Sequence, residues 1–238
     1  MSAYGAVISR NRPAAPLAST AWLCKPRASV PTHLTLHHLT LASASMLPGL
    51  VPYLHRCFAD ELERGATYPQ EILPGEPYTQ AQFETYYFAA DVIVGIVGLG
   101  DAPDSDGAAV QGGVEEARQG RGWEECVAGV YYVKPNYPGR SSHICNAGFL
   151  IPLAQRAKGF GSVLAKSYLH YAPRLGYEAS VFNLVYVNNI ASVRMWESLG
   201  FTKAGLIPRA GRLKKADGSG EEYVDAWVIY KQFETVQQ

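Results

Sequence analysis

The chain has 238 residues, 47% of them hydrophobic and 18% charged, and its formal net charge at pH 7 is zero. Such a length and apolar content fit one globular domain with a single core. A neutral chain lacks the basic footprint that nucleic acid or an acidic membrane surface would select, and no apolar run approaches the length of a membrane span. Neither partner is therefore expected.

The four cysteines are widely scattered and have no metal-ligand spacing, so we expect no metal and, inside a cell, reduced thiols. The first 31 residues are rich in Ser, Ala and Arg, and the first acidic residue is Asp60. That composition is typical of a mitochondrial transit peptide, but Pro13, Pro16 and Pro26 interrupt any amphipathic helix there. We therefore expect residues 1–31 to be a disordered tail on a cytoplasmic protein, with a mitochondrial location as the alternative.

Residues 32–238 are expected to form the folded domain. Thr79 is a good N-cap, Gly65 a good helix end, and Pro52 is expected to interrupt the first helix. Apolar periodicity predicts, in order, a strand at 33–37, helices at 47–64 and 79–87, strands at 88–99, 127–134 and 143–151, a helix at 162–175, a strand at 181–187, a helix at 189–199, and closing strands at 201–207 and 223–230.

Residues 101–125 contain many Gly, Asp and Glu and few large apolar side chains, so we expect a mobile loop there. A Gly- and Lys-rich loop at 211–220 is expected to join the closing strands. Consecutive strands with helices between the later ones predict an α/β (α+β) fold, in which helices flank a mixed central sheet.

An Arg-x-x-Gly-x-Gly motif begins at Arg156 and lies between the apolar run 149–151 and the helical pattern that starts at Ser162. Glycines allow the backbone to approach a ligand closely, and the free N–H groups of a helix start attract an anion. A second block spans residues 182–201: a strand, an asparagine pair, and an amphipathic helix with Asn189 as N-cap and Gly200 just beyond its end.

Together these blocks resemble the Gcn5-related N-acetyltransferase superfamily. The resemblance implies a mixed-sheet fold for residues 32–238 and acetyl transfer from acetyl-CoA to an amine by direct attack in a ternary complex. In that superfamily the glycine motif holds the coenzyme pyrophosphate and the second block flanks the pantetheine arm. The implied coenzyme-binding residues are Phe149, Leu150, Ile151, Arg156, Ala157, Lys158, Gly159, Phe160, Gly161, Ser162, Asn189, Ser192 and Trp196.

A narrower resemblance rests on residues 131–138, 142–149, 182–185, 65–70 and 208–211. These segments look like the fungal N-acetyltransferases that detoxify proline analogues such as azetidine-2-carboxylate. This resemblance runs from about Leu34 to the last residue and omits the 101–125 insert. It implies a small imino acid as the acceptor amine.

The superfamily resemblance also implies that the strand at 146–151 separates from the strand at 181–187 and admits the coenzyme. A backbone N–H near Phe149 or Leu150 would then polarise the acetyl carbonyl. Asn146 and Asn183 are the expected catalytic-site side chains, because the matching asparagines of the narrower family bind the acceptor's carboxylate and orient its amine. An asparagine inside a buried strand also needs a specific partner, which supports a role for Asn183.

The acid and base of the reaction are less defined by the sequence. His143 has a suitable intrinsic pKa for a base, although a plain strand-end histidine is the preferred interpretation. Many superfamily members place a tyrosine where Trp196 stands, and tryptophan has no proton to give, so solvent is the expected acid. Cys145 and His143 allow a covalent acetyl-enzyme as an alternative, but a small core thiol is preferred.

Tyr68 and Gln70 are expected in a loop over the acceptor site, and Arg209 is a further cation for a substrate carboxylate. Other acceptors stay open at this stage: a polyamine, an aminoglycoside-like drug or a protein N-terminus. The alternative that is not an enzyme is a module that binds acyl-CoA as a sensor without turnover. The expected partner is a small-molecule amine, and the oligomeric state, including a homodimer, stays open.

Overall fold

The computed structural model describes residues 13, 15–26, 30–73 and 75–234, so about half of the predicted tail lies outside the described residues. Within them the strands are β1 (Thr20–Leu23), β2 (His33–Leu39), β3 (Asp91–Val97), β4 (Ala108–Ala109), β5 (Val127–Pro135), β6 (Ile144–Leu150), β7 (Ala179–Tyr186), β8 (Thr202–Lys214) and β9 (Glu221–Gln232). The helices are α1 (Leu41–Ser45), α2 (Leu50–Arg64), α3 (Gln80–Tyr87), α4 (Val114–Arg118), α5 (Trp123–Cys126), α6 (Phe160–Arg174) and α7 (Ile190–Ser198), with short 3-10 turns at Gly139–Ser141 and Leu153–Gln155.

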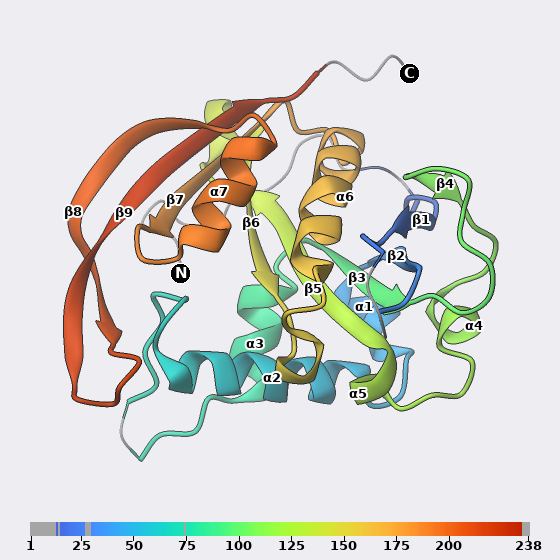
Figure 1. Ribbon diagram of the computed structural model, residues 1–238, viewed down its shortest axis with the longest axis horizontal. Helices are drawn as coiled ribbons and strands as arrows, with labels where there is room; N and C mark the ends of the chain where they lie inside the picture. Colours follow the sequence, from blue (N-terminus) through green and yellow to red (C-terminus); the bar gives the residue numbers. More distant parts are fainter. Residues whose placement is uncertain (1–12, 14, 27–29, 74, 235–238) are drawn as a thin grey trace.

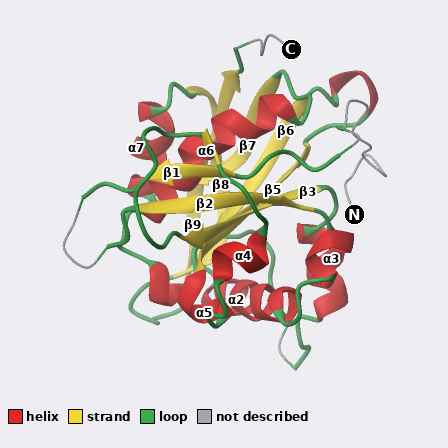
Figure 2. Cartoon of the chain, turned by 90° about the vertical axis from the view of Figure 1, so that its right-hand side faces the viewer, coloured by secondary structure: helices red, strands yellow, loops and turns green. Residues whose placement is uncertain are grey.

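These strands form one sheet in the order β4-β1-β2-β3-β5-β6-β7-β9-β8. Every neighbouring pair is antiparallel except β6 and β7, which are parallel. Helices α6 and α7 cover one face, and α2, α3, α4 and α5 cover the other (Figure 2). Two apolar cores result, one on each face of the sheet. The predicted mixed sheet flanked by helices is therefore confirmed.

Local sequence explains where the helices begin and end. Thr79 caps α3 through a capping box with Gln82, as its residue type predicts. Gly65 ends α2 with a left-handed φ of 61°. The predicted interruption at Pro52 is wrong, because Pro52 lies in the first turn of α2, where no helical carbonyl needs its missing N–H.

Two other expectations are corrected by the sheet. Residues 20–23 do not belong to a tail, because they form β1 and pair with β2 from Thr20↔Leu36 onward. The 101–125 segment is not a structureless loop: it contains β4, α4 and α5. Trp123 is buried there, and its indole N–H donates to the Pro48 carbonyl oxygen at 2.9 Å. A few anchoring side chains thus order a segment whose overall composition is polar.

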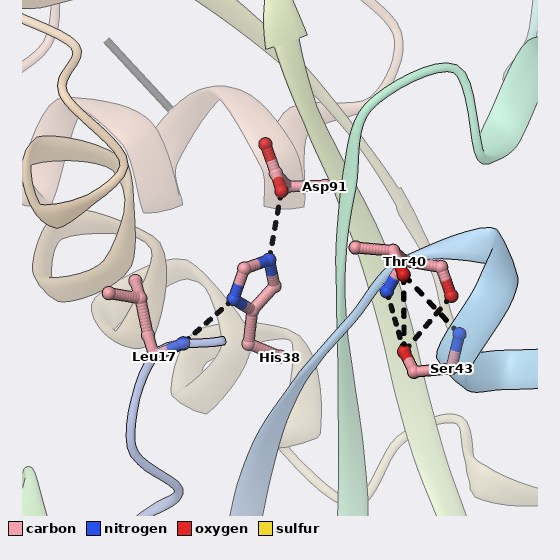
Figure 3. Close-up of polar contacts among 5 residues, drawn as sticks. All are labelled: Leu17, His38, Thr40, Ser43 and Asp91. Carbon is pink, nitrogen blue, oxygen red and sulfur yellow. Dashed lines mark hydrogen bonds and ion pairs between the residues drawn. The ribbon is translucent and has the colours of Figure 1, made fainter. Parts of the chain in front are cut away.

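A buried polar contact fixes the start of the sheet (Figure 3). The Leu17 N–H donates to His38 Nδ1 at 3.0 Å, so His38 Nε2 carries the proton that it donates to Asp91 at 2.9 Å. Both side chains are almost fully buried. The contact ties the chain before β1 to β2 and β3, at a position that no sequence motif marks.

The β8–β9 hairpin is longer than predicted and forms the curved edge of the sheet on the left of Figure 1. Residues 211–214 belong to β8 and not to a loop. Its far end meets the end of α2, where the Lys214 N–H donates to the Gly65 carbonyl oxygen at 2.9 Å. The hairpin thereby faces the α2–α3 connection.

Candidate active site

The predicted separation of β6 from β7 is present. The two strands pair only at Ile144↔Ala179 and Cys145↔Ser180. Beyond Cys145, β6 continues beside β5 as far as Leu150, while β7 pairs with β9. The two strands are therefore neighbours at the start of β6 and β7 and separate beyond it. This gap is the opening expected for the pantetheine arm of the coenzyme.

The glycine motif forms the start of α6. Gly159 is the N-cap with a left-handed φ of 85°, and Ala157 also has a positive φ of 62°. Apart from the adjoining backbone, a Cβ at Gly159 or Gly161 would meet no atom of the protein within 4 Å. No acceptor in the described part of the chain meets the backbone N–H groups of residues 158–161. Free amides, open space and a helix start together fit a phosphate group.

The side chains of this loop have other partners. The Arg156 guanidinium pairs with the carboxylate of Glu61, a buried residue of α2 that also accepts a hydrogen bond from Thr67. Lys158 Nζ donates to the side-chain oxygen of Gln155 at 2.9 Å. The predicted support of the pyrophosphate by Arg156 stays a prediction, and the structure gives that side chain an additional structural partner.

Other predicted coenzyme residues lie either at the opening and the start of α7 or in the apolar core. Asn189 caps α7 by accepting from the Ser192 N–H at 3.1 Å, and Phe149 is half-buried at the opening. Trp196 is only 4% exposed and packs against the rings of Phe182 and Phe201 at 4.6 and 5.0 Å. The structure therefore shows a core role for Trp196, and a coenzyme contact stays a prediction.

The two predicted acceptor asparagines are brought together by a third that was not predicted. Asn136 Oδ1 accepts from Asn146 Nδ2 at 2.9 Å and from Asn183 Nδ2 at 2.7 Å. Asn136 directly follows β5, while Asn146 and Asn183 lie on the separated strands. Asn136 is not among the site residues expected from the sequence, although it lies within the resemblance segment 131–138. One sequence feature could have identified Asn136: it is an asparagine at the end of the strand that precedes the one with Asn146.

Tyrosines of the α2–α3 region bond to β6 at the opening. The Tyr68 hydroxyl donates to the Phe149 carbonyl oxygen at 3.0 Å, and Tyr87 donates to the Gly148 carbonyl oxygen at 3.1 Å. Gly148 has to be glycine here, because a Cβ would lie 2.5 Å from the Tyr132 ring. Burial raises the pKa of Tyr68 and Tyr87 well above 10, so both stay protonated donors.

The remaining predicted residues are not part of this arrangement. His143 is exposed, with its Nδ1 near the Arg140 carbonyl oxygen. Cys145 is fully buried against the Tyr168 hydroxyl at 3.0 Å, and burial raises its pKa to about 12, as expected of a core thiol. Arg209 is exposed and stacks on the Tyr223 ring at 3.9 Å.

A cavity of about 890 Å³ lies between the α2–α3 connection and the β8–β9 hairpin. Tyr68 and Gln70 line it, as does Tyr186 of β7. The Tyr186 hydroxyl and Gln70 Oε1 are buried without a hydrogen-bond partner in the described structure. Buried polar atoms are normally satisfied, so two such atoms in one cavity wall indicate a place for a polar ligand.

Comparisons with known proteins agree with this geometry. The sequence profile of the Acetyltransferase (GNAT) family matches residues 52–201. The N-acetyltransferase aca1 of Schizosaccharomyces pombe is 41% identical over 180 residues, which cover 74% of this chain and 77% of that protein. Protein SPT10 of Saccharomyces cerevisiae is 29% identical over 81% of this chain, a match that spans 33% of its own length.

Solved structures show the same fold. A GCN5-related N-acetyltransferase from Kribbella flavida is 22% identical, with a TM-score of 0.60 over 84% of this chain and 98% of its own. The yncA protein of Salmonella typhimurium, solved with its cofactor acetyl-CoA, is 17% identical, with a TM-score of 0.55 over 86% of this chain and 96% of its own.

The chain therefore belongs to the GNAT acetyltransferase family. It is an N-acetyltransferase that uses acetyl-CoA. Among the described residues no group of histidine, cysteine and acidic side chains could hold a metal ion. No helix in the described ranges is long and apolar enough to cross a membrane.

Proposed function

We propose that this enzyme acetylates the ring amine of a proline-like imino acid, such as azetidine-2-carboxylate, by direct transfer in a ternary complex. One observation carries the proposal: three asparagine amides meet where β6 and β7 separate. Amides offer donors and acceptors without a net charge, so they suit a small zwitterion. A polycationic acceptor would instead favour carboxylates, and the cluster contains none.

The coenzyme would be held by the residues that the sequence singled out. The free N–H groups of residues 158–161 would bind its pyrophosphate, and the opening between β6 and β7 would take its pantetheine arm. Bound there, acetyl-CoA supplies an activated acetyl group. Phe149 and Leu150 of β6 would border that group, and a backbone N–H of this segment would polarise its carbonyl.

The acceptor would be oriented by Asn146 and Asn183. Asn136 Oδ1 takes one amide hydrogen from each, which fixes how the two side chains turn. The cavity beneath the β8–β9 hairpin is the proposed entrance, because Tyr68 lines it and also bonds to Phe149 of β6. Since His143 is exposed and Cys145 is buried and neutral, water is the proposed acceptor of the amine proton.

The test is thiol release from acetyl-CoA with azetidine-2-carboxylate, for wild type and Asn183→Ala. We expect turnover by the wild type and a loss of at least tenfold in the variant, with unchanged affinity for acetyl-CoA. Gln111→Ala, which alters an exposed amide side chain outside both motif blocks, is the matched control. Binding of acetyl-CoA without release of thiol would contradict the proposed acceptor and leave the coenzyme assignment standing.

A further inference from the structure

A lysine next to the asparagine cluster has no anionic partner among the described residues. Lys134 lies on β5 directly opposite Asn146 of β6, so the two side chains leave the same face of the sheet. Asn136, two residues further along, also bonds to Asn146. Lys134 is the only lysine or arginine on β5 and β6, and it lies within residues 131–138 of the narrower family resemblance, where the sequence indicated no role for it.

Two rings and a carbonyl hold the Lys134 ammonium. It lies 3.9 Å from the ring centre of Tyr86 and 4.2 Å from that of Tyr132, and it donates to the Tyr86 carbonyl oxygen at 3.0 Å. The Tyr132 ring in turn packs against β6, since a Cβ at Gly148 would touch it. The ammonium is therefore held in place rather than free in solvent.

Its charge is not balanced within the described chain. The seven ion pairs of the described residues do not include Lys134, and burial alone accounts for its lowered pKa. An ammonium has three N–H donors, and the Tyr86 carbonyl takes one. A partly buried cation without a carboxylate is costly, and a ligand that brings an anion would remove this cost.

We infer that Lys134 is a specificity-determining residue that binds the carboxylate of the acceptor, so the substrates of this enzyme are amino or imino acids rather than simple amines. The inference rests on the proposed function, because it assumes that the acceptor binds at the asparagine cluster. The asparagines then orient the amine and share the carboxylate with the ammonium, which selects the acid over counterparts that lack a carboxylate.

The experiment compares azetidine-2-carboxylate with azetidine-2-carboxamide, which keeps the ring amine and lacks the negative charge of the carboxylate. Wild type, Lys134→Met and Lys134→Arg are assayed by thiol release. Methionine keeps the apolar stem over the two rings and arginine keeps the cation. We expect the ratio of kcat/KM for acid over amide to fall at least tenfold in Lys134→Met and to be largely retained in Lys134→Arg.

Lys203→Met is the matched control, because Lys203 also lies over a ring, that of Trp227 at 4.6 Å, but pairs with Glu197. Its acid-over-amide ratio should equal that of wild type. Acetyl-CoA affinity and Tm, measured for each variant, identify any loss of folding. An unchanged ratio in Lys134→Met, or an equal loss for acid and amide, overturns the inference.

The outcomes also separate this inference from the proposed function. If wild type acetylates neither azetidine compound, the same ratio is measured with a panel of α-amino acids and their amides. A preference for acids that depends on Lys134 would support the carboxylate contact and contradict the imino-acid acceptor. Turnover confined to amines without a carboxylate, including polyamines, would contradict both the proposed function and this inference.

Discussion

Asn183 on β7 donates its side-chain amide to Asn136 Oδ1 at 2.7 Å, although β6 lies between β5 and β7 in the sheet. The contact is possible because β6 and β7 stop pairing after Cys145 and leave room for side chains in the gap. Asn136 therefore holds the side chains of the two asparagines that we propose touch the acceptor.

A double-mutant cycle tests this relationship. We expect Asn136→Ala to lower kcat/KM by about ten- to a hundredfold, since removing a partner from a partly buried amide costs about 1–3 kcal/mol. Asn136→Ala should add little in the Asn183→Ala background, because the positioned amide is already gone. Steady-state kinetics of the four proteins provide the measurement. Fully additive losses would show that Asn136 acts independently of Asn183.

The two glycines of the coenzyme loop should respond differently to alanine. Gly161 has ordinary φ and open space around it, so Gly161→Ala should leave Tm unchanged or slightly raised and should weaken acetyl-CoA binding at least tenfold. Gly159 has a φ of 85°, so Gly159→Ala should also lower stability by about 1–2 kcal/mol. Calorimetric titration and thermal unfolding measure the two effects. Unchanged affinity in Gly161→Ala would place the pyrophosphate elsewhere.

The Glu61–Arg156 pair links α2 to the coenzyme loop. Glu61→Gln keeps the shape of the side chain and removes the charge, so it should lower stability by about 1–2 kcal/mol, a modest value because Arg156 is 38% exposed. Arg156→Met should weaken acetyl-CoA binding in the wild type and much less in the Glu61→Gln background. Equal weakening in both backgrounds would contradict a role through Glu61 and support the direct contact of the guanidinium with the coenzyme that the family resemblance implies.

Cys145 should be dispensable for chemistry. Burial raises its thiol pKa to about 12, so almost no thiolate exists at neutral pH. We expect Cys145→Ala to keep kcat within about twofold, because Tyr168 still bonds to Ser180 at 2.6 Å. Mass spectrometry after incubation with acetyl-CoA alone should find no acetyl group on the peptide that contains Cys145. An acetylated Cys145 would restore the covalent route.

Lys134 predicts a specific pH dependence for anionic ligands. Burial lowers its pKa from 10.5 to about 8, and the two tyrosines that cover it, Tyr86 and Tyr132, have raised pKas and stay neutral. A bound carboxylate favours the protonated form, so affinity is full below pH about 8 and falls as pH rises above it. The Kd of N-acetyl-azetidine-2-carboxylate, which has no titrating amine, should rise about tenfold between pH about 7 and about 9.

Calorimetric titration in the presence of desulfo-coenzyme A, which has no thiol to ionise, measures this dependence. Lys134→Met should give weaker binding with a flat profile over the same range. A wild-type profile that is also flat would argue against a charged contact between Lys134 and the carboxylate.

The sequence by itself determined the family and most of the elements. The Arg-x-x-Gly-x-Gly motif, the Thr79 and Asn189 caps and the Gly65 end are local features, because caps and left-handed turns depend on residues a few positions apart. The separation of the strand at 146–151 from the strand at 181–187 followed from the family resemblance and is confirmed.

Only the tertiary structure decided which side chains meet. The contacts of Asn136 with Asn183, Lys134 with Tyr86 and Glu61 with Arg156 join residues that are 47, 48 and 95 positions apart. The strand at 20–23 and the ordered 101–125 segment were missed for the same reason. Their stability comes from pairing with β2 and from burying Trp123, which polar composition does not reveal. Local propensity depends on neighbouring residues. Packing and hydrogen bonding across the sheet depend instead on the register in which distant strands pair.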